Sequence, residues 1–387
     1  MKTKIAILGS TGSIGKSLIK ILVKDKAKLE IILLTSNKNY RELLKQIKLF
    51  NVKNIIINDY KTFLHVKKIL RNKKINIYNK FDHFNKIFKV KIDYTMSAIS
   101  GFDGLKPTLD IIKFTKRIAI ANKESIICGW SLIKKNLDKY KSQFIPVDSE
   151  HFSIWSLMNN STSSNIEKVF ITASGGPFKD SPIKDFKYIT PKQALKHPNW
   201  SMGKKISIDS ATMMNKVFEI IEAKKIFGFK YNQLEILVHT KSYVHAIVKF
   251  TNGLIKILVH ETDMKIPIFN SLYSNFEKKI KSKKIDFEIL NNLNFQKVDV
   301  KKFPIVNLIK SLPSKDSLFE TVIVSANDCL VNNFLNKKIN FLDISKFLFR
   351  ILNSKEFIKY KQKEPLNIAE IKKLNKYVSV KVNNLCI

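Results

Sequence analysis

Residues 4–23 read KIAILGSTGSIGKSLIKILV, an apolar run followed by three glycines and then a periodic apolar segment. The pattern predicts a strand over residues 4–8, a turn over 9–15 and a helix over 17–23. A phosphate approaches a backbone closely only where side chains are absent, and a helix N-terminus offers unpaired N–H groups to an anion. Gly9, Gly12 and Gly15 satisfy both conditions. Their spacing is G-x-x-G-x-x-G rather than G-x-G-x-x-G, so a dinucleotide site is favoured and a plain tight turn stays open.

The same alternation of strand and helix continues along the first part of the chain. Further strands are predicted over residues 29–34, 54–57, 96–99 and 117–121, with a helix over 41–50. Such alternation is typical of a parallel sheet with crossover helices. We therefore predict an α/β protein whose N-terminal domain, residues 1–148, holds a Rossmann-like parallel sheet.

The remaining sequence predicts two further domains. A central α+β domain over residues 149–280 is expected to hold a strand at 168–173, a long loop at 174–203, a helix at 211–227 and antiparallel strands at 234–238, 243–250 and 254–259. Asn252 and Gly253 predict a hairpin turn between the last two strands. Residues 281–302 are expected to form a linker and residues 303–387 a C-terminal helical bundle.

The formal net charge of +37 invites comparison with nucleic-acid-binding proteins. Only four of the 69 basic residues are arginines, and the lysines are spread along the chain. Base recognition favours the planar fork of arginine, so we attribute the charge to AT-rich codons and expect no nucleic-acid partner. The charge still attracts anionic ligands at low salt.

The three cysteines, Cys128, Cys329 and Cys386, are odd in number and far apart, which fits neither a disulfide framework nor a CxxC metal site. The apolar run at residues 5–8 is too short for a signal peptide, and no run reaches the ~18 residues of a membrane span. We expect a soluble, unprocessed, cytoplasmic protein with reduced thiols and no membrane partner.

The predicted strand at 29–34 is followed by TSNKN at 35–39, which contains no carboxylate. An acidic residue at this point would hold the ribose 2′-hydroxyl of NAD, whereas Lys38 and small hydroxyl groups suit a 2′-phosphate. The segment therefore favours NADP(H). The alternative, that Lys38 is an ordinary solvated loop lysine, stays open.

Asp148 and Glu150 follow an apolar segment that ends at Pro146. In an extended segment, residues two apart point to the same face, so these carboxylates are predicted to hold a hard cation such as Mg²⁺ or Mn²⁺. An exposed pair of carboxylates without a metal is the alternative.

A second polar group lies in the predicted helix at 211–227. Asn215, Lys216 and Glu219 are three and four residues apart, so one helix face carries an amide, an ammonium and a carboxylate. Asp209 or Ser210 is expected to cap this helix and to place N–H groups where a phosphate docks. A plain intrahelical ion pair is the alternative.

The long loop at 174–203 begins with Ser174-Gly175-Gly176 and ends near His197 and Trp200. A serine followed by two glycines forms a concave turn of N–H donors for an anion. Trp200 is a candidate to close over a small ligand, which makes the loop a candidate lid. An ordinary loop histidine is the alternative for His197.

Six motifs in order, GSTGSIG (9–15), ANKES (121–125), VDSE (147–150), SGGPF (174–178), HPNWSMG (197–203) and IDSATMMNK (208–216), resemble those of the 1-deoxy-D-xylulose 5-phosphate reductoisomerases. The segments 325–328 (SAND) and 341–344 (FLDI) extend the resemblance. It implies an NADPH-binding domain, a catalytic domain with a mobile lid and a C-terminal helical bundle, assembled as a homodimer.

The resemblance also implies a role for each matching residue. The metal ligands would be Asp148, Glu150 and Glu219, which with Lys123 form the catalytic group. The substrate would contact Ser149, Ser174, His197, Trp200, Ser210, Asn215 and Lys216. The cofactor would contact Gly9, Thr11, Gly12, Ser13, Ile14, Lys38, Asn39, Asn122, Glu124, Met202 and Gly203.

The sequence departs from the family pattern at three places. Asn37 stands where a glycine is usual, Val217 replaces the glycine after Asn-Lys, and the tetrapeptide HETD at 260–263 replaces a Gly-Ser-Pro-Asp pattern. Val217 favours the helix. The change at 260–263 puts a turn or a subunit contact in doubt.

The implied reaction rearranges and reduces 1-deoxy-D-xylulose 5-phosphate to 2-C-methyl-D-erythritol 4-phosphate for non-mevalonate isoprenoid synthesis. The metal acts as a Lewis acid while the C3–C4 bond breaks and the skeleton re-forms, and NADPH then reduces the aldehyde. A retro-aldol sequence and a concerted alkyl shift both stay open. The rivals are a plain NADP-dependent dehydrogenase, which needs no metal, and a basic nucleic-acid-binding protein.

Overall fold

The computed structural model describes residues 2–159, 161–200, 202–273 and 278–386. Residues 1, 160, 201, 274–277 and 387 lie outside this description, although the predicted domains and loop include them. The chain divides into two compact units. Unit 1 comprises Met1–Ser125, Ser131–Asp148 and Met264–Ile280, and unit 2 comprises Ile126–Trp130, Ser149–Asp263 and Lys281–Ile387.

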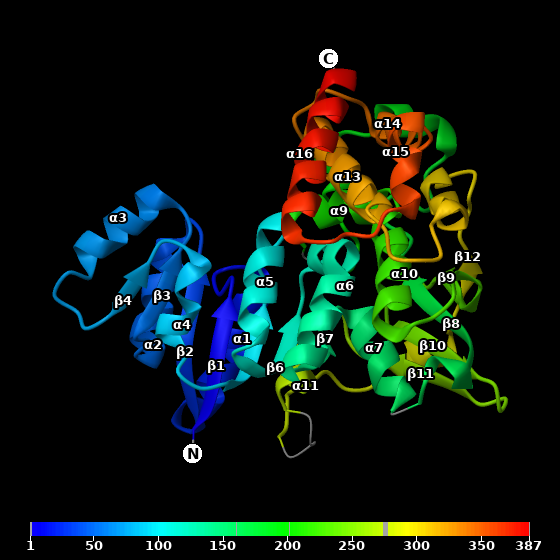
Figure 1. The fold of residues 1–387 in the computed structure, drawn as a ribbon. Helices are drawn as coiled ribbons and strands as arrows, with labels where there is room; N and C mark the ends of the chain where they lie inside the picture. The colour runs from blue at the N-terminus through cyan, green and yellow to red at the C-terminus, as the bar shows by residue number, and fades with distance from the viewer. Residues whose placement is uncertain (1, 160, 201, 274–277, 387) are drawn as a thin grey trace. The chain divides into compact units, whose positions relative to one another are not determined.

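Unit 1 is built on a seven-stranded sheet in the order β4-β3-β2-β1-β5-β6-β7, with every pair parallel (Figure 1). The strands are β1 (Thr3–Leu8), β2 (Leu29–Ser36), β3 (Asn54–Ile57), β4 (Asn76–Tyr78), β5 (Ile92–Ser97), β6 (Thr115–Ile120) and β7 (Gln143–Pro146). The helices are α1 (Ser13–Leu22), α2 (Tyr40–Phe50), α3 (Tyr60–Ile69), α4 (Phe84–Ile87), α5 (Leu105–Ile112), α6 (Lys123–Tyr140) and α11 (Lys265–Leu272). The predicted parallel sheet is confirmed.

The core of unit 1 explains why the strands read as continuous apolar runs. Ile5, Ile7 and Ile55 are fully buried, and residues of α1 and α11 complete the same cluster. Strands covered by helices on both faces need apolar residues at successive positions. The strand order reverses between β1 and β5, and in open parallel sheets ligands bind beyond the carboxyl ends of the strands at such a point.

Unit 2 contains a five-stranded sheet in the order β11-β10-β8-β9-β12. Its strands are β8 (Ile166–Ala173), β9 (Leu234–Val238), β10 (Val244–Phe250), β11 (Ile255–Val259) and β12 (Gln296–Lys297). The predicted hairpin of β10 and β11 is antiparallel. The prediction for β9 is confirmed only in part, because β9 pairs antiparallel with β12 but in parallel with β8, which separates it from β10.

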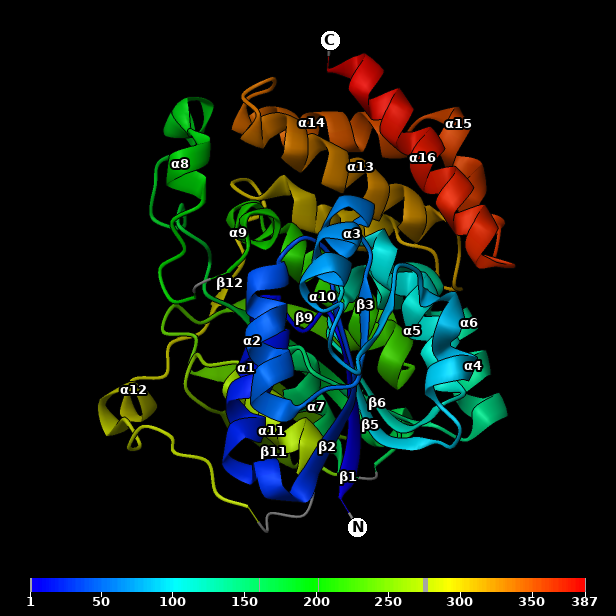
Figure 2. The ribbon, with the colours of Figure 1, turned by 90° about the vertical axis from the view of Figure 1, so that its left-hand side faces the viewer.

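The helices of unit 2 are α7 (Ser149–Met158), α8 (Pro191–Ala194), α9 (Lys204–Ala211), α10 (Met214–Phe227), α12 (Phe287–Asn291), α13 (Phe319–Leu335), α14 (Phe341–Leu352), α15 (Lys355–Ile358) and α16 (Ile368–Leu385). Helix α13 packs against both α14 and α16, which confirms the predicted helical C-terminal region (Figure 2). None of the helices in the described part of the chain has the length and apolar character that crossing a membrane requires.

Three local predictions were wrong in ways that affect the site. Helix α1 begins at Ser13, with Gly12 as its N-cap, rather than at residue 17. Asp148, Ser149 and Glu150 do not form an extended segment, because α7 begins at Ser149. Asp209 and Ser210 do not cap α10, because they lie inside the preceding helix α9.

Candidate active site

The glycine turn of unit 1 is tightly packed. Gly9 has a φ of 81°, and a Cβ added there would lie 2.7 Å from the carbonyl oxygen of Ala98, just beyond β5. A Cβ on Gly15 would lie 2.5 Å from the carbonyl oxygen of Gly9. Only glycine fits at either position, so the backbone can present N–H groups at the N-terminus of α1.

The residues after β2 close the same end of the sheet. Thr11 Oγ1 lies 3.0 Å from Ser36 Oγ, and the Gly9 N–H donates to Thr35 Oγ1 at 2.8 Å. Asn39 caps α2 by accepting from the Glu42 N–H at 3.3 Å, and Lys38 is exposed beside it. An exposed ammonium at the end of β2, where no carboxylate stands, is compatible with a 2′-phosphate.

Asn122 and Glu124 hold the loop after β5. Asn122 Oδ1 caps α6 by accepting from the Ser125 N–H at 2.6 Å, and its Nδ2 donates to the carbonyl oxygens of Ile99 and, at 2.8 Å, Gly101. Glu124 Oε2 accepts from the Gly101 N–H at 3.4 Å. Both side chains therefore shape the rim of the predicted nucleotide site from the carboxyl end of β6.

Three carboxylates gather where β7 runs into α7. Asp148, Glu150 and Glu219 each offer an oxygen, and these oxygens all lie within 4.8 Å of one another. Asp148 is joined directly to the first residue of α7, Glu150 lies in the first turn of that helix, and Glu219 lies on α10. The structure thus brings together segments about seventy residues apart.

Two lysines balance most of this negative charge. Lys123 Nζ donates to Asp148 Oδ2 at 2.7 Å. Lys216 Nζ donates to Glu150 Oε1 at 2.8 Å and also to Glu219 Oε2. Burial alone would lower the pKa of Lys216, but the charges of Glu150 and Glu219 raise it well above its ordinary value. Lys216 is therefore a permanent ammonium between two carboxylates, and more than the intrahelical partner that spacing alone allows.

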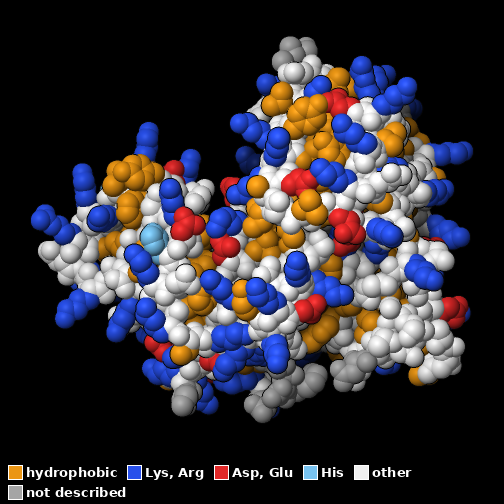
Figure 3. Space-filling model, in the orientation of Figure 1, with side chains coloured by type: hydrophobic (Ala, Val, Ile, Leu, Met, Phe, Trp, Pro, Cys, Tyr) orange, Lys and Arg blue, Asp and Glu red, His pale blue; other side chains and the backbone are white. Residues whose placement is uncertain are grey.

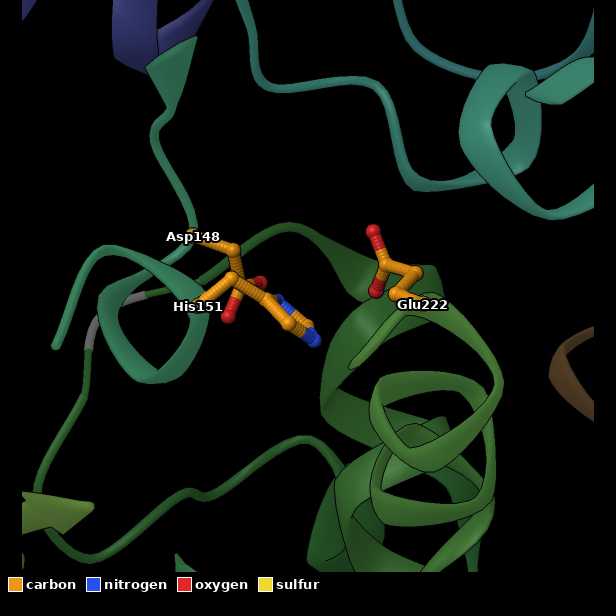
Figure 4. A group of neighbouring side chains, drawn as sticks. All are labelled: Asp148, His151 and Glu222. Atoms are coloured by element: carbon orange, nitrogen blue, oxygen red, sulfur yellow. The ribbon is translucent and has the colours of Figure 1, made fainter. Parts of the chain in front are cut away.

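A second group overlaps the first. Asp148, His151 and Glu222 also have ligand atoms within 4.8 Å of one another. Figure 4 shows these three side chains. His151 Nε2 donates to the carbonyl oxygen of Glu219 at 2.9 Å. Our sequence interpretation missed His151 and Glu222, although the i+3 spacing of Glu222 from Glu219 was a usable signal.

The donor set fits a hard divalent cation. Asp148, Glu150 and Glu219 supply only oxygen, which Mg²⁺ and Mn²⁺ prefer. Asn215 Nδ2 donates to Glu219 Oε1, and Ser149 Oγ donates to Glu150 Oε2 at 2.6 Å, so both carboxylates are oriented by neighbours. Such outer contacts are typical of metal-binding carboxylates.

The predicted phosphate residues also come together in unit 2. Gly175 and Gly176 have φ values of 88° and 72°, and the Gly176 N–H donates to Ser174 Oγ at 3.1 Å. A Cβ on Gly176 would lie 2.8 Å from the carbonyl oxygen of Ser210 at the end of α9. The glycine turn after β8 therefore packs directly against the end of α9.

His197 lies beside Ser174 as a neutral ring. Its Nδ1 accepts from the Asn199 and Trp200 N–H groups at 3.2 and 2.9 Å, so its Nε2 carries the proton and faces Ser174 Oγ at 3.2 Å. Burial and the charge of Lys216 lower the pKa of His197 to about 4. Lys216 therefore acts on both the carboxylate cluster and the predicted phosphate site.

The long loop at 174–203 is more ordered than expected. It contains a 3₁₀ turn at Ile183–Tyr188 and the short helix α8, and its far end is held by Asn199, whose Nδ2 donates to Thr240 O at 2.7 Å and Ser242 Oγ at 2.8 Å. The Trp200 ring meets His245 edge to face at a centroid distance of 6.2 Å. Met202 and Gly203 lead into α9, where Gly203 is the N-cap.

A Rossmann-type sheet with a glycine turn, together with an oxygen-only acidic cluster and a second glycine turn suited to an anion, defines a dinucleotide-binding protein with a centre for a divalent cation and a phosphorylated ligand. Family models agree with this class. Residues 5–129 match the model for 1-deoxy-D-xylulose 5-phosphate reductoisomerase, residues 144–227 its C-terminal domain, and residues 260–379 the DXP reductoisomerase C-terminal domain.

The chain is 64% identical to the 1-deoxy-D-xylulose 5-phosphate reductoisomerase of Pelagibacter ubique, over 99% of this chain and 100% of that protein. The enzyme of Zymomonas mobilis, solved in complex with NADPH, is 31% identical and superposes with a TM-score of 0.89, covering 100% of this chain and 99% of the other. A DOX-P reductoisomerase solved with NADPH, fosmidomycin and magnesium is 31% identical with a TM-score of 0.90, covering 99% and 98%. This chain belongs to the 1-deoxy-D-xylulose 5-phosphate reductoisomerase family.

Proposed function

We propose that this chain converts 1-deoxy-D-xylulose 5-phosphate to 2-C-methyl-D-erythritol 4-phosphate with NADPH and a divalent cation, a step of non-mevalonate isoprenoid precursor synthesis. The observation that carries the proposal is the carboxylate cluster of Asp148, Glu150 and Glu219 beside the anion site of Ser174, in a chain related over its full length to enzymes of that name. A plain dehydrogenase would have no use for the cluster.

Each part of the chain has a proposed task. Residues 1–148 form the NADPH-binding domain, residues 149–280 the catalytic domain with its lid at 174–203, residues 281–302 a linker and residues 303–387 a helical domain. The NADPH contacts are Gly9, Thr11, Gly12, Ser13, Ile14, Lys38, Asn39, Asn122 and Glu124, with Met202 and Gly203 from the lid. NADPH supplies the hydride for the reductive step.

The phosphate of the substrate is proposed to bind Ser174, His197, Ser210, Asn215 and Lys216. Lys216 and the neutral Nε2–H of His197 offer it a charge and a donor. Because the phosphate is remote from the reacting carbons, its binding energy is available for orientation and for closing Trp200 over the substrate.

At the reacting end, Asp148, Glu150 and Glu219 would hold Mg²⁺ or Mn²⁺, which supplies Lewis acidity toward the carbonyl and hydroxyl oxygens of the substrate. Lys123, now donating to Asp148 Oδ2, is placed to donate to an oxygen next to that carboxylate and to stabilise the negative charge that develops there. Ser149 is proposed to contact the same oxygens.

We further propose a cytoplasmic homodimer. Cys128, Cys329 and Cys386 form no disulfide among the described residues, which fits a reducing compartment. Strand β11 lies at the edge of its sheet and exposes Ile255 and Ile257, with 60% and 44% of their surface accessible, and Leu254 just before the strand is 57% exposed. Exposed apolar edge strands invite pairing with another chain, and a second copy of this chain is the proposed occupant. No nucleic-acid or membrane partner is proposed.

The test is NADPH oxidation followed by absorbance with 1-deoxy-D-xylulose 5-phosphate as substrate. We expect turnover that stops when the metal is chelated, returns with Mg²⁺ or Mn²⁺, and is much slower with NADH. Turnover that survives chelation would assign the chain to the metal-free dehydrogenases instead. Equal kcat/KM values for NADPH and NADH would refute the assignment of Lys38 to the 2′-phosphate.

A further inference from the structure

His260 is a buried residue that neither the fold nor the proposed phosphate and metal contacts explain. It follows β11 in the tetrapeptide that departs from the family pattern, at the position where a glycine is expected. Only 8% of its surface is exposed. A buried imidazole in place of a glycine adds two polar nitrogens to the interior, and each requires a partner.

One of these nitrogens has a partner and fixes the state of the ring. His260 Nδ1 lies 2.7 Å from the carbonyl oxygen of Glu261. A carbonyl oxygen only accepts, so Nδ1 carries the proton. Burial lowers the pKa of His260, although its hydrogen bond to Glu261 and the charges of Glu150, Glu261 and Asp263 oppose this effect. The ring is therefore neutral near pH 7, and its Nε2 presents a lone pair.

The other nitrogen is unsatisfied. Among the residues that the structure describes, none forms a hydrogen bond with His260 Nε2, although the atom is shielded from solvent. Leaving a buried acceptor unpaired costs free energy. An apolar side chain would fill the same space without this cost. The lone pair is thus available to a donor that arrives with a ligand.

The contacts of the ring connect it to the proposed substrate site. His260 stacks on His245 with centroids 3.7 Å apart and planes inclined by 18°. His245 in turn meets Trp200, the ring proposed to close over the substrate. His245 Nε2 donates to the carbonyl oxygen of His260 at 3.2 Å, which fixes both rings. The His260 ring is therefore linked through His245 to Trp200 of the proposed lid, and the charge of Glu150 acts on it.

We propose that His260 is a further substrate-binding residue whose Nε2 accepts a hydrogen bond from a hydroxyl group of the bound sugar phosphate. The inference rests on the proposed function, because it takes Trp200 and Glu150 as residues of the substrate and metal site. A polyol chain supplies hydroxyl donors, whereas the phosphate and the carbonyl group supply only acceptors. His260 thereby adds a contact to a hydroxyl group in a site whose charged residues bind the phosphate and the metal.

Two substitutions distinguish the effect of the Nε2 lone pair on substrate binding from the effect of the ring. His260→Phe keeps a planar ring for stacking on His245 but removes the acceptor. His260→Gln loses the stack but returns an amide oxygen near the position of Nε2. Should His260→Phe fail to fold, as judged by thermal unfolding, His260→Leu supplies a variant of similar size without an acceptor.

The measurements are KM and kcat for 1-deoxy-D-xylulose 5-phosphate, and its dissociation constant by calorimetry with Mg²⁺ and without NADPH. We expect His260→Phe to raise KM and the dissociation constant about five- to tenfold, the effect of one neutral hydrogen bond, with kcat little changed. His260→Gln is expected to stay within about twofold of the wild type. NADPH affinity is the control and should not change.

Wild-type binding by His260→Phe would overturn the inference, as would equal losses in His260→Phe and His260→Gln, which would show that the ring rather than the nitrogen matters. These outcomes are distinct from a failure of the proposed function. If the proposed function is wrong, the wild type does not oxidise NADPH with this substrate at all. The calorimetric comparison still decides whether His260 contacts the sugar phosphate.

Discussion

Glu219 is the most deeply buried of the three proposed metal ligands. It is 1% exposed, accepts from Lys216 and Asn215 on its own helix, and lies within 4.8 Å of the ligand oxygens of Asp148 and Glu150. A carboxylate is almost never buried unless it is paired or coordinates a metal. Glu219 is paired with Lys216, and the oxygens of Asp148 and Glu150 beside it would complete a cation site.

Replacing Glu219 with glutamine keeps the size and helix position and removes one negative charge. Because Lewis-acid and electrostatic stabilisation contribute several kcal/mol in the transition state, Glu219→Gln should lower kcat by more than ~100-fold at saturating metal. NADPH affinity should not change. Glu167→Gln, which breaks an exposed 2.6 Å ion pair with Lys249, is the matched control and should keep near-normal turnover. Full activity of Glu219→Gln would exclude the three-carboxylate site.

The lowered pKa of His197 predicts that the free energy of unfolding depends on pH. Its pKa is about 4 in the folded chain against an ordinary value of 6.5, so between these values the unfolded chain binds more protons. The stabilising contribution of the neutral ring is thus complete above pH 6.5 and is lost as the pH falls toward 4. The free energy of unfolding, measured by denaturant titration, should fall more steeply over this window in the wild type than in His197→Gln. Parallel curves would show that the ring is not held neutral.

At the scale of elements, the sequence predicted those whose pattern is strong and local. Strand β3 was predicted with its observed bounds, Asn54–Ile57, because a short apolar run ended at polar residues on both sides. The spacing of Asn215, Lys216 and Glu219 likewise placed three polar groups on one face of α10 before the fold was known. Periodicity within one element is readable from sequence.

Helix α9 could not be predicted because tertiary contacts stabilise it. Its residues KKISIDSA include two serines and an aspartate, which prefer caps and turns to helix interiors. The structure provides Asn327 on α13, whose Nδ2 donates to Asp209 Oδ1 at 2.7 Å, and Lys205, which pairs with Asp209 and Asp328. The ligand candidate His151 was missed for a similar reason, because its neighbour Glu219 is close only after α7 and α10 pack together.

The loop at 174–203 gives a prediction at the same scale. Its far end is held to the turn between β9 and β10 by two hydrogen bonds from Asn199, so Asn199→Ala should speed protease cleavage between residues 174 and 203 in the free protein. Substrate, Mg²⁺ and NADPH together should protect the loop. Asn292→Ala, which removes an exposed bond within α12, is the control. Cleavage that ligands leave unchanged would show that the loop is not a lid.

At the scale of the whole molecule, the excess of lysine is a surface property. Figure 3 shows lysine and arginine side chains scattered over the visible face and interleaved with apolar and acidic ones, rather than gathered in one patch. On this face the basic side chains do not form the focused stripe that is the footprint of a specific nucleic-acid binder. The net charge of +37 does favour the approach of anionic substrates and cofactors at low ionic strength.

The proposed homodimer predicts that a charge on the exposed face of β11 prevents association. Ile257→Lys should shift the protein from dimer to monomer in light scattering coupled to size-exclusion chromatography, because a lysine at an apolar interface must be desolvated without a partner. Leu366→Lys, at a more exposed apolar position of unit 2, is the control and should leave the mass unchanged. A wild type that is monomeric at micromolar concentration would refute the dimer.

The central claim is that one site both rearranges and reduces its substrate. The most direct measurement is the ¹³C NMR spectrum of the product formed from 1-deoxy-D-xylulose 5-phosphate labelled at C3 and C4, with NADPH and Mg²⁺. Rearrangement breaks the bond between the labelled carbons and joins C4 to C2, so the one-bond coupling between the labels should disappear as NADPH is consumed. A reduced product that retains this coupling would contradict the account, because it would show a plain reduction of an unrearranged chain.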